Sequence, residues 1–579
     1  MYKALDLFDI DQRLIYIRNI FIFLLALLIV GLVYFQLVKA DEYVELASGN
    51  RLRMVRILPP RGNIYDASGV PLAVNVRTFD IKGYPMDLRR EEDFANVSSL
   101  FVRHGIPMTP DSLKANVEKQ YVAPYRAVSV ATNLTLAQVS DLVMDSDFSQ
   151  VLFPSPVWRR IYPGGALVAH VIGYVGEITR DELEDQRDLY YQAGDIIGKN
   201  GIEAMYEEDL RGMVGDQVVE VDSRGRRLRD INYNDPQKGG DIRLTLDLAA
   251  QREAARIMGD RRGAMVAMDV NDGSVLVFLS SPTFDPNPLT WGISQKEWNS
   301  LLEDKDRPMM NRVIGGAYPP GSTFKVVTAS AILMEKIANT RSTVFCPGNF
   351  QLGPQTFRCW RRSGHGTESL LGAIRDSCDV YFYQMGVKVG IDRLTKWGQA
   401  LGVGERTGID LPGELRGVRA GREWKRSATK TKESWYQGDT VNYSIGQGFL
   451  LMTPMQLARV FAVFANKGNL VTPKLNANKK PELKKVGISR ENIDIIGRGL
   501  REVVTRGSGR AANNYGVEIA GKTGTAQNPH GDDHALFVGY APASNPRYVT
   551  AVIVEGGGSG ASTAGPLVAR MLAYLLEHN

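Results

Sequence analysis

The hydrophobic pattern first marks a membrane segment near the N-terminus. Residues 20–38 read IFIFLLALLIVGLVYFQLV, an uncharged apolar stretch that is long enough to cross a bilayer as a helix. No polar face interrupts it, as one would in a helix covering a soluble core. It is also longer than the core of a cleavable signal peptide, so it predicts a retained single-pass anchor. Lysines and arginines lie on both sides of this segment, so their distribution barely decides its orientation in the membrane. We expect residues 1–19 to be a cytoplasmic tail because of the chemistry described below.

The region after the anchor mixes strand-like and helix-like patterns. It begins with short apolar runs separated by turn residues, whereas residues 109–146 and 200–210 have apolar positions at helical spacing. Lys238-Gly239-Gly240 is a flexible break directly before a new alternating segment. We therefore expect one mixed α/β domain over residues 41–237 and a second domain over residues 240–579.

The second domain combines alternating apolar runs with amphipathic helices. The runs are residues 263–268, 274–278, 536–540 and 548–554, and the helices are residues 251–258 and those from 566 onward. Neighbouring antiparallel strands flanked by helices are typical of the α+β class. The predicted fold class is therefore α+β, with one transmembrane helix, an elongated mixed α/β domain, and a catalytic domain built on a central antiparallel sheet flanked by helices.

Composition agrees with a folded, multidomain protein. The chain has 579 residues, whereas a single core stops growing at about 250–300 residues. The hydrophobic fraction of 44% and the charged fraction of 23% are those of globular proteins and exclude a largely disordered chain. The net charge of +5 is small for this length, and we expect no nucleic-acid partner.

Ser322 and Lys325 are the first candidate catalytic residues. Tyr318-Pro319-Pro320-Gly321 forms a turn directly before the apolar run 326–334, so Ser322 should lie at the start of a helix. Because Lys325 follows Ser322 by three residues, the two side chains should lie on the same face of this helix. There the Lys325 amine can take the serine proton if burial keeps that amine neutral. Alone, S-x-x-K is equally the pattern of a helix cap followed by a surface lysine.

Two further segments supply groups for the same chemistry. Ser377 and Asp379 precede an aromatic helical run; Ser377 can relay a proton to a leaving group, or it can simply cap that helix. Lys522-Thr523-Gly524-Thr525 follows the alternating residues 517–520, as an edge strand beside a cleft would. Lys522 can hold positive charge there, Gly524 lets a substrate backbone come close, and the Thr525 N–H can donate to an oxyanion.

A nucleotide site and a Ser-His-Asp hydrolase are competing interpretations. Residues 516–523 match the pattern G-x-x-x-x-G-K-[ST], but they alternate like a strand and are not followed by a helix start. The sequence has no G-x-S-x-G elbow. Both interpretations are disfavoured, because three motifs in this order are a far more specific signal than any one of them.

The three motifs together carry a family resemblance. The sequence resembles the penicillin-binding proteins, in which S-x-x-K, S-x-N/D and K-T/S-G occur in this order, and the resemblance covers nearly everything after the anchor. Asp379 stands where asparagine is commoner. Other segments resemble the elongation-type branch of class B, the penicillin-binding protein 2 group: Arg61-Gly62-Asn63-Ile64-Tyr65-Asp66, Gly201-Ile202-Glu203, Tyr318-Pro319-Pro320-Gly321, Gly446-Gln447-Gly448 and Ala520-Gly521.

This resemblance implies a serine-type D-Ala-D-Ala transpeptidase with possible carboxypeptidase side activity. Ser322 would be acylated by peptidoglycan stem peptides, which are then cross-linked during cell elongation, and β-lactams would acylate the same serine. The anchor would lie in the bacterial inner membrane with the catalytic domain in the periplasm. Residues 41–237 would form a non-catalytic pedestal that contacts a RodA-like SEDS glycosyltransferase and scaffold proteins of the elongation complex. The alternatives are a structural activator of that polymerase with secondary catalysis and, with weaker support, a β-lactam hydrolase or sensor.

All three cysteines of the chain lie in one short segment together with a histidine. Cys346, Cys359, His365 and Cys378 are a complete ligand set for tetrahedral zinc. A Cys346–Cys359 disulfide with Cys378 as a buried apolar residue is the alternative in an oxidising periplasm. Because some relatives have metal ligands at matching places, we expect structural zinc that braces the cleft, and no organic cofactor.

Overall fold

The computed structural model describes residues 6–41, 43, 52–124, 126–148, 152–185, 191–222, 227–429, 431–528 and 531–578. The first five residues of the expected cytoplasmic tail lie outside this set. The chain forms two compact units. The first takes Met1–Pro59, Thr78–Val157 and Met213–Lys238, and the second takes Pro60–Arg77, Trp158–Gly212 and Gly239–Asn579. The sequence predicted one domain over residues 41–237 and a second over residues 240–579. The structure instead assigns residues 60–77 and 158–212, which lie within the first predicted domain, to the second unit.

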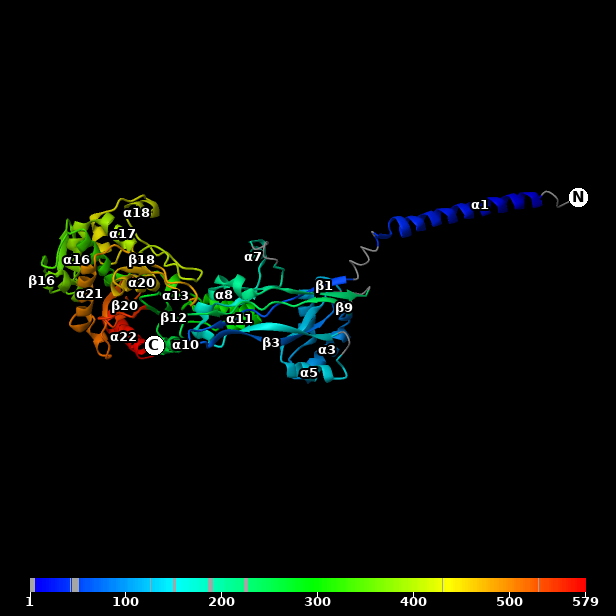
Figure 1. Ribbon diagram of the computed structural model, residues 1–579, viewed down its shortest axis with the longest axis horizontal. Coiled ribbons are helices and arrows are strands. Elements are labelled where there is room, and N and C mark those ends of the chain that lie inside the picture. The colour runs from blue at the N-terminus through cyan, green and yellow to red at the C-terminus, as the bar shows by residue number, and fades with distance from the viewer. Residues whose placement is uncertain are drawn as a thin grey trace. The chain divides into compact units, whose positions relative to one another are not determined.

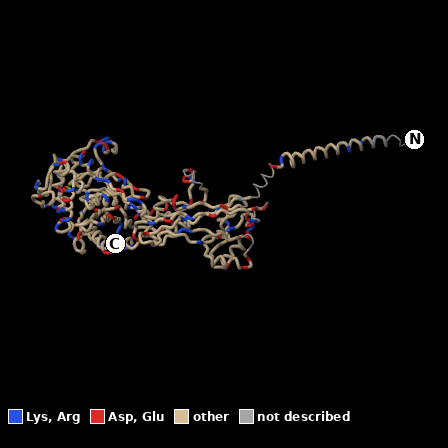
Figure 2. Tube along the Cα trace, in the orientation of Figure 1, with Lys and Arg blue, Asp and Glu red and all other residues tan. Residues whose placement is uncertain are grey.

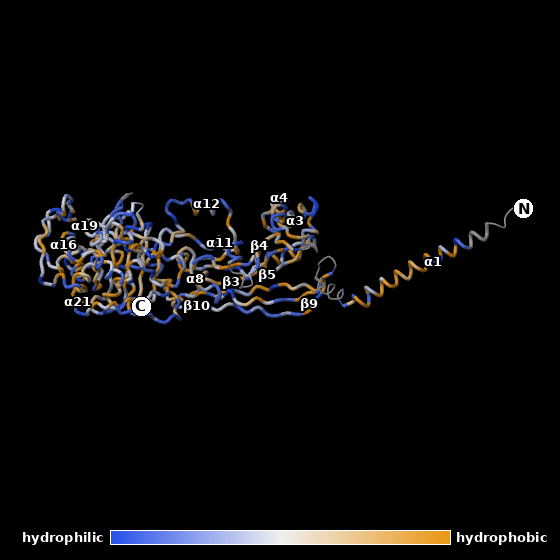
Figure 3. The backbone as a smooth tube through the Cα atoms, turned by 90° about the horizontal axis from the view of Figure 1, so that it is seen from above, coloured by the Kyte–Doolittle hydropathy of each residue, from blue (hydrophilic) through white to orange (hydrophobic). Residues whose placement is uncertain are grey.

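The first unit begins with one long helix, α1 (Asp6–Val33), which continues as a π-helix over Tyr34–Val38. From Gln12 to Val38 the helix is long and apolar enough to cross a membrane, and none of its most apolar window is buried. Figure 3 shows this hydrophobic run, and Figure 2 shows that most of it carries no charged residue. These properties agree with the single-pass anchor expected from residues 20–38.

Two antiparallel arrangements make up the rest of the first unit. One is a sheet of order β1-β8-β9, formed by β1 (Leu52–Ile57), β8 (Gly215–Val221) and β9 (Arg227–Asn234). In the other, the end of β3 (Pro71–Gly83) pairs with β4 (Val128–Leu134) and shares a core with α3 (Glu91–Arg103), α4 (Pro110–Gln120) and α5 (Leu136–Met144). The helical pattern predicted for 109–146 is therefore wrong at 128–134. There, buried Val128 and Val130 flank the half-buried Ser129, which is the alternation of a strand.

The second unit is organised by a five-stranded antiparallel sheet of order β12-β11-β21-β20-β19. The strands are β11 (Gly263–Asp269), β12 (Val275–Ser281), β19 (Ala520–Ala526), β20 (His534–Ala541) and β21 (Tyr548–Val554). The four apolar runs predicted as strands are confirmed. The alternating residues 517–520 were predicted to form the strand before the lysine motif. In the structure strand pairing begins only at Ala520, opposite Tyr540, so the lysine motif itself forms the edge strand.

Successive residues of the sheet belong to two separate cores, one on each face. Met265 and Ala267 of β11 share a core with α10 (Leu248–Met258) and the C-terminal helix α22 (Gly565–His578). Figure 1 shows these two helices close together, with α22 in red. Ala264 and Val266 belong to the larger core, which includes α14 (Lys325–Met334), α16 (Asp379–Val389) and α20 (Pro454–Ala465). The sheet is buried on both sides, and its edge strand β19 packs beside α21 (Arg490–Thr505).

The second unit also contains shorter elements. They are β2 (Ile64–Tyr65), α6 (Ala169–Ile172), β6 (Val175–Glu177), α7 (Arg180–Asp185), β7 (Ile196–Gly198), α8 (Gly201–Met205), α9 (Glu207–Arg211), β10 (Ile242–Arg243), α11 (Asn287–Trp291), α12 (Gln295–Glu303), α13 (Arg312–Gly315), β13 (Thr343–Cys346), β14 (Asn349–Leu352), β15 (Gln355–Arg358), β16 (Gly366–Ser369), α15 (Leu370–Arg375), α17 (Ile391–Ala400), α18 (Arg422–Ala428), α19 (Gln437–Ser444), β17 (Asn469–Val471) and β18 (Leu483–Lys485). Glu203 of α8 is fully buried and accepts hydrogen bonds from the guanidinium groups of Arg61 and Arg160. This ion cluster ties together segments that are far apart in the sequence.

Candidate active site

Ser322 lies in a 3-10 turn (Gly321–Phe324) that leads directly into α14. Ser322 is half-buried, whereas Lys325, the first residue of α14, is fully buried. Because side chains three residues apart eclipse one another in a 3-10 helix, Ser322 and Lys325 share one face, as the S-x-x-K spacing predicted. The turn requires Gly321 with a φ of +53°, since that backbone conformation is strained for other residues.

Lys325 reaches across to the second predicted motif. Its Nζ donates to the backbone oxygen of Ser377 at 2.8 Å, to Ser377 Oγ at 3.2 Å and to Asp379 Oδ1 at 2.7 Å. The other oxygen of Asp379 accepts a hydrogen bond of 2.8 Å from the backbone N–H of Trp360. Lys325 is therefore held by three acceptors and is not a surface lysine.

Ser377 does not cap the helix that follows it. The N-cap of α16 is Cys378, which makes no side-chain capping bond. Ser377 has a φ of +56°, a left-handed conformation that costs free energy in a residue with a side chain. Its Oγ accepts a hydrogen bond of 2.8 Å from Lys522 Nζ in addition to the bond from Lys325. The hydroxyl thus lies between two amines from distant parts of the chain.

Lys522 provides the second amine, from the buried strand β19. Burial is the main cause that holds the pKa of Lys522 well below its usual range, and the positive charge of Lys325 lowers that pKa further. The positive charge that the sequence led us to expect on Lys522 is therefore disfavoured by its burial. The assignment of Lys325 as the general base remains a prediction, because Lys325 is paired with a carboxylate.

The residues that follow Lys522 in the third motif lie beside the turn that carries Ser322. Thr523 Oγ1 lies 3.2 Å from Ser508 Oγ. A Cβ at Gly524 would approach Thr323 Cγ2 to 2.9 Å and the Pro320 oxygen to 3.0 Å, so this glycine allows β19 to lie directly against the serine turn. Thr525 is the exposed residue of β19. A G-K-T sequence inside a strand, with no helix after it, lacks the geometry of a phosphate-binding loop.

Sequence reasoning gave no role to the turn at Gly446. The Gly321 N–H donates to the Gly446 oxygen at 2.9 Å, and a Cβ at Gly446, whose φ is +76°, would come within 2.2 Å of the Gly321 oxygen. The next residue, Gln447, donates to the Thr525 oxygen at 3.3 Å. This turn supports both the serine turn and β19. The family resemblance of Gly446-Gln447-Gly448 and its glycine-rich sequence were the signals that could have revealed this contact.

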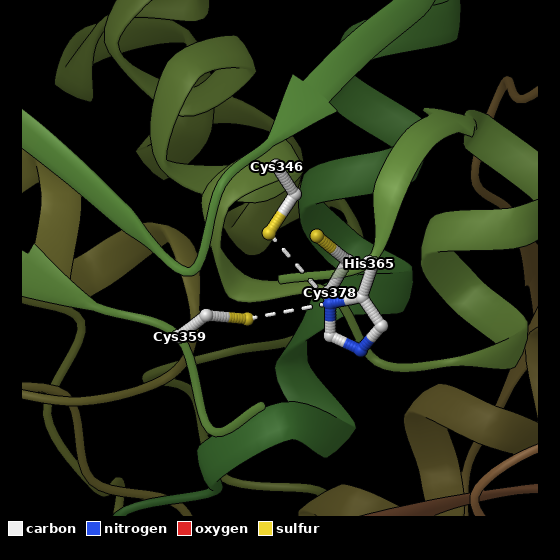
Figure 4. A group of neighbouring side chains, drawn as sticks. All are labelled: Cys346, Cys359, His365 and Cys378. Carbon is white, nitrogen blue, oxygen red and sulfur yellow. Dashed lines mark hydrogen bonds between the residues drawn. The ribbon is translucent and has the colours of Figure 1, made fainter. Parts of the chain in front are cut away.

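The predicted metal ligands also come together. Cys346, Cys359, His365 and Cys378 each offer a ligand atom, and these atoms all lie within 4.8 Å of one another. Figure 4 shows His365 Nδ1 facing two sulfur atoms, 3.7 Å from Cys346 Sγ and 3.5 Å from Cys359 Sγ. All three cysteines are free thiols. A hydrogen bond with the Cys378 thiol lowers the pKa of Cys359 to about 5.

The donor set and its spacing fit zinc. With zinc–sulfur and zinc–nitrogen bonds of about 2.3 and 2.05 Å, tetrahedral geometry separates sulfur from nitrogen by about 3.6 Å. The two sulfur–nitrogen distances in the cluster lie on either side of this value. Cys378 stands between Ser377 and Asp379, and Cys359 directly precedes Trp360, which donates to Asp379. Any ion held here would brace the second motif.

Comparisons with known proteins agree with this arrangement. Residues 263–573 match the model of the penicillin-binding protein transpeptidase domain, and residues 56–244 match that of the penicillin-binding protein dimerisation domain. The peptidoglycan D,D-transpeptidase MrdA of Escherichia coli K12 is 34% identical over 597 residues, covering 96% of this chain and 92% of that protein.

Solved structures are similar over the same extent. Penicillin-binding protein 2 (PBP2) of Helicobacter pylori, solved in complex with MreC, has a TM-score of 0.83 and 31% identity, covering 91% of this chain and 99% of that one. A chain from a peptidoglycan synthase complex that coordinates polymerization and crosslinking has a TM-score of 0.74 and 30% identity, covering 98% and 99%. The chain therefore belongs to the class B penicillin-binding proteins, within the PBP2/MrdA group of serine-type peptidoglycan D,D-transpeptidases that act in cell elongation.

Proposed function

We propose that Ser322 is the nucleophile and that two lysines and Ser377 manage its protons. Ser322 Oγ attacks the carbonyl carbon between the two D-alanines of a stem peptide. Its proton passes to the amine of Lys522, whereas Lys325 stays paired with Asp379 and positions Ser377. The Thr525 N–H donates to the oxyanion. Ser377 returns a proton to the departing amine, so that D-alanine leaves and a Ser322 ester remains. An amine of a second stem then attacks this ester, which forms the cross-link and restores the serine.

One observation carries this mechanism: Lys325, one turn after Ser322 in the chain, and Lys522, from the strand that lies against the serine turn, both donate to Ser377 Oγ. Mass spectrometry of the full-length protein after exposure to a penicillin tests it. The adduct is expected on the peptide that contains Ser322 and should be lost in Ser322→Ala. It should persist in Ser300→Ala, which changes an exposed serine on α12. An adduct on any other residue would refute the assignment.

The cysteine and histidine cluster is proposed to hold one structural zinc ion. Cys346, Cys359, His365 and Cys378 supply the four ligands, and the ion fixes Ser377 and Asp379 without contacting substrate. About one zinc per chain is expected in purified protein, and Cys359→Ser should lower both the zinc content and the melting temperature. Protein without zinc, with two thiols that react only after reduction, would instead indicate the Cys346–Cys359 disulfide.

The location and partners are inferred from the anchor and the relatives. The proposed arrangement is an inner-membrane anchor with the chain from residue 41 onward in the periplasm, where peptidoglycan is assembled. The Helicobacter pylori relative binds MreC, and another relative belongs to a synthase complex, which supports a scaffold protein and a RodA-like SEDS glycosyltransferase as partners. Co-purification of the anchored chain with such a polymerase tests this. Ser322→Ala should abolish cross-linking while leaving polymerase stimulation intact if activation is a separate role.

A further inference from the structure

A chain of hydrogen bonds leads from the third motif to a loop that the mechanism above does not use. The loop follows α21, and its Ser508 is half-buried. Ser508 Oγ lies 3.2 Å from Thr523 Oγ1 and 3.2 Å from the backbone oxygen of Arg375. Thr523 Oγ1 in turn lies 3.4 Å from Lys522 Nζ. Three separate segments are thus connected, with the catalytic amine at one end.

The main chain of the loop fixes the position of Ser508. The Ser508 N–H also donates to the Arg375 oxygen, at 3.1 Å. Gly507 allows this approach, because a Cβ at that position would collide with the same oxygen. The Gly509 N–H donates to the Val503 oxygen at 2.9 Å, which ties the loop back to α21. The backbone therefore holds Ser508 beside Thr523, and the hydroxyl proton is the part that can still turn.

The carbonyl at the far end sets the direction of the bonds in the chain. A carbonyl oxygen can only accept, so the bond to Arg375 uses the single proton of the Ser508 hydroxyl. Ser508 Oγ then has lone pairs to offer, and Thr523 is the donor in the contact between the two hydroxyls. With its own proton used in this way, Thr523 Oγ1 presents lone pairs to Lys522 and accepts from it.

This direction determines what remains of the Lys522 amine for catalysis. A neutral amine has two N–H groups and one lone pair. One N–H donates to Ser377 Oγ at 2.8 Å, and the other is shared by the backbone and side-chain oxygens of Thr523, at 3.3 and 3.4 Å. The lone pair is then left for the proton of Ser322. If Thr523 instead turned its own proton toward Lys522, it would occupy that lone pair and stabilise the neutral amine.

The charged groups around Lys522 leave this amine with uncharged acceptors. Burial is the main cause that holds the pKa of Lys522 well below its usual range, and the charge of Lys325 lowers that pKa further. The charges of Asp379 and Asp376 raise it, but these carboxylates already have basic partners, in that order Lys325 and Arg375. Within the described part of the chain, the hydrogen bonds of this amine go to uncharged oxygen atoms. The way those oxygens turn their protons therefore affects how readily the amine takes one.

We infer that Ser508 is a positioning residue: its hydroxyl makes Thr523 an acceptor and so leaves the lone pair of the Lys522 amine for the serine proton. The inference rests on the proposed function, because it requires that Lys522 takes the proton of Ser322. The amine becomes an ammonium when it does so, and Thr523 still accepts from one of its three N–H groups. Ser508 acts through Thr523 and needs no contact with the substrate.

The test measures how acylation of Ser322 by a fluorescent penicillin depends on pH. Rapid quenching of the full-length enzyme over a range of penicillin concentrations gives the rate at saturation and the half-saturating concentration. In Ser508→Ala the Thr523 proton is released and can turn toward Lys522. The saturated rate should then fall about tenfold, as for the loss of one hydrogen bond to a charged group, while the half-saturating concentration stays unchanged.

The pH profile separates this role from a structural one. A hydrogen bond from Thr523 to the neutral amine lowers the pKa of that amine, so the rising limb of the Ser508→Ala profile should move to lower pH by about one unit. Ser508→Thr keeps the hydroxyl and should restore the wild-type rate and profile. Ser427→Ala is the matched control, because Ser427 Oγ also donates to a backbone oxygen, at 2.9 Å, but on the exposed side of α18.

A second background shows whether Ser508 acts through Thr523. Thr523→Val removes the middle hydroxyl of the chain, and adding Ser508→Ala to it should neither slow acylation further nor move the limb. The inference is overturned if Ser508→Ala, with a wild-type melting temperature, keeps the wild-type limb, or if it moves the limb equally in the Thr523→Val background. A wild-type enzyme that forms no penicillin adduct at Ser322 would refute the proposed function instead.

Discussion

Replacing Asp379 with asparagine, the commoner family residue, should impair this enzyme because its two carboxylate oxygens serve two different donors. Oδ1 accepts from Lys325 Nζ at 2.7 Å and Oδ2 accepts from the Trp360 N–H at 2.8 Å. An asparagine has one oxygen and one NH₂ group. Whichever way its amide turns, the NH₂ group must face either the Trp360 N–H or the Lys325 ammonium, and two donors then oppose each other.

The cost follows from the burial of these groups. Lys325 is fully buried and Asp379 is 7% exposed. A buried donor left without an acceptor costs about 1–3 kcal/mol, and removing one charge from a buried ion pair costs about 3–5 kcal/mol. Since the asparagine oxygen can still accept one bond, we expect Asp379→Asn to lower the free energy of unfolding by about 2–4 kcal/mol. Penicillin acylation should slow at least about tenfold, because Lys325 loses the carboxylate that positions it.

Two measurements check this prediction. Denaturant unfolding gives the change in stability, and rapid-quench labelling with a fluorescent penicillin gives the acylation rate. Asp392→Asn is the control, because among the described residues the exposed Asp392 carboxylate pairs with one exposed arginine, so the substitution should change stability by less than about 1 kcal/mol. If Asp379→Asn unfolded and acylated like the wild type, the carboxylate pairing could not be what holds Lys325 in place.

Three further changes probe other parts of the second unit. Glu203→Gln should cost about 3–5 kcal/mol of stability in denaturant unfolding, because two buried arginines lose their shared carboxylate; an unchanged midpoint would contradict this. Gly446→Ala should unfold at lower denaturant and acylate slowly, since its Cβ would meet the Gly321 oxygen at 2.2 Å, whereas Gly413→Ala, also at positive φ but in open space, should lose only stability. Burial, followed by a nearby arginine, lowers the pKa of His170 to about 4, so the folded protein keeps this imidazole neutral. The unfolded chain binds the extra proton below about pH 6.5; stability present above that pH is therefore lost as the pH falls toward 4, by up to about 3 kcal/mol, and His170→Phe should flatten the curve.

Much of the fold could be predicted from the sequence because the patterns were local. The four buried strands and the helices beside them follow from runs of apolar residues, and the anchor follows from its length. The strand at Val128–Leu134 was missed because its alternation lies between two helices whose spacing dominates the surrounding pattern. The start of β19 was missed for another reason. Its motif is rich in small residues with weak strand propensity, and only pairing with β20 makes it a strand.

The candidate site was predictable as a set of residues but not as a network. The motifs named Ser322, Lys325, Ser377 and Lys522, and the structure brings the last three into hydrogen-bond contact. The sequence could not indicate that Asp379 pairs with Lys325, or that burial would lower the pKa of Lys522. Ser508 had no signal at all, because an isolated serine in a glycine-rich loop is unremarkable until Thr523 is found beside it.

The bond between Lys522 and Ser377 spans 145 residues, and this separation limits when the protein can react. During synthesis the hydroxyl of Ser377 is present long before Lys522, 145 residues later, joins the chain. Molecules in which the final strands have not yet joined the sheet should therefore not react with a penicillin. Covalent labelling in a pulse-chase experiment would then report the completion of folding, not merely the presence of the chain.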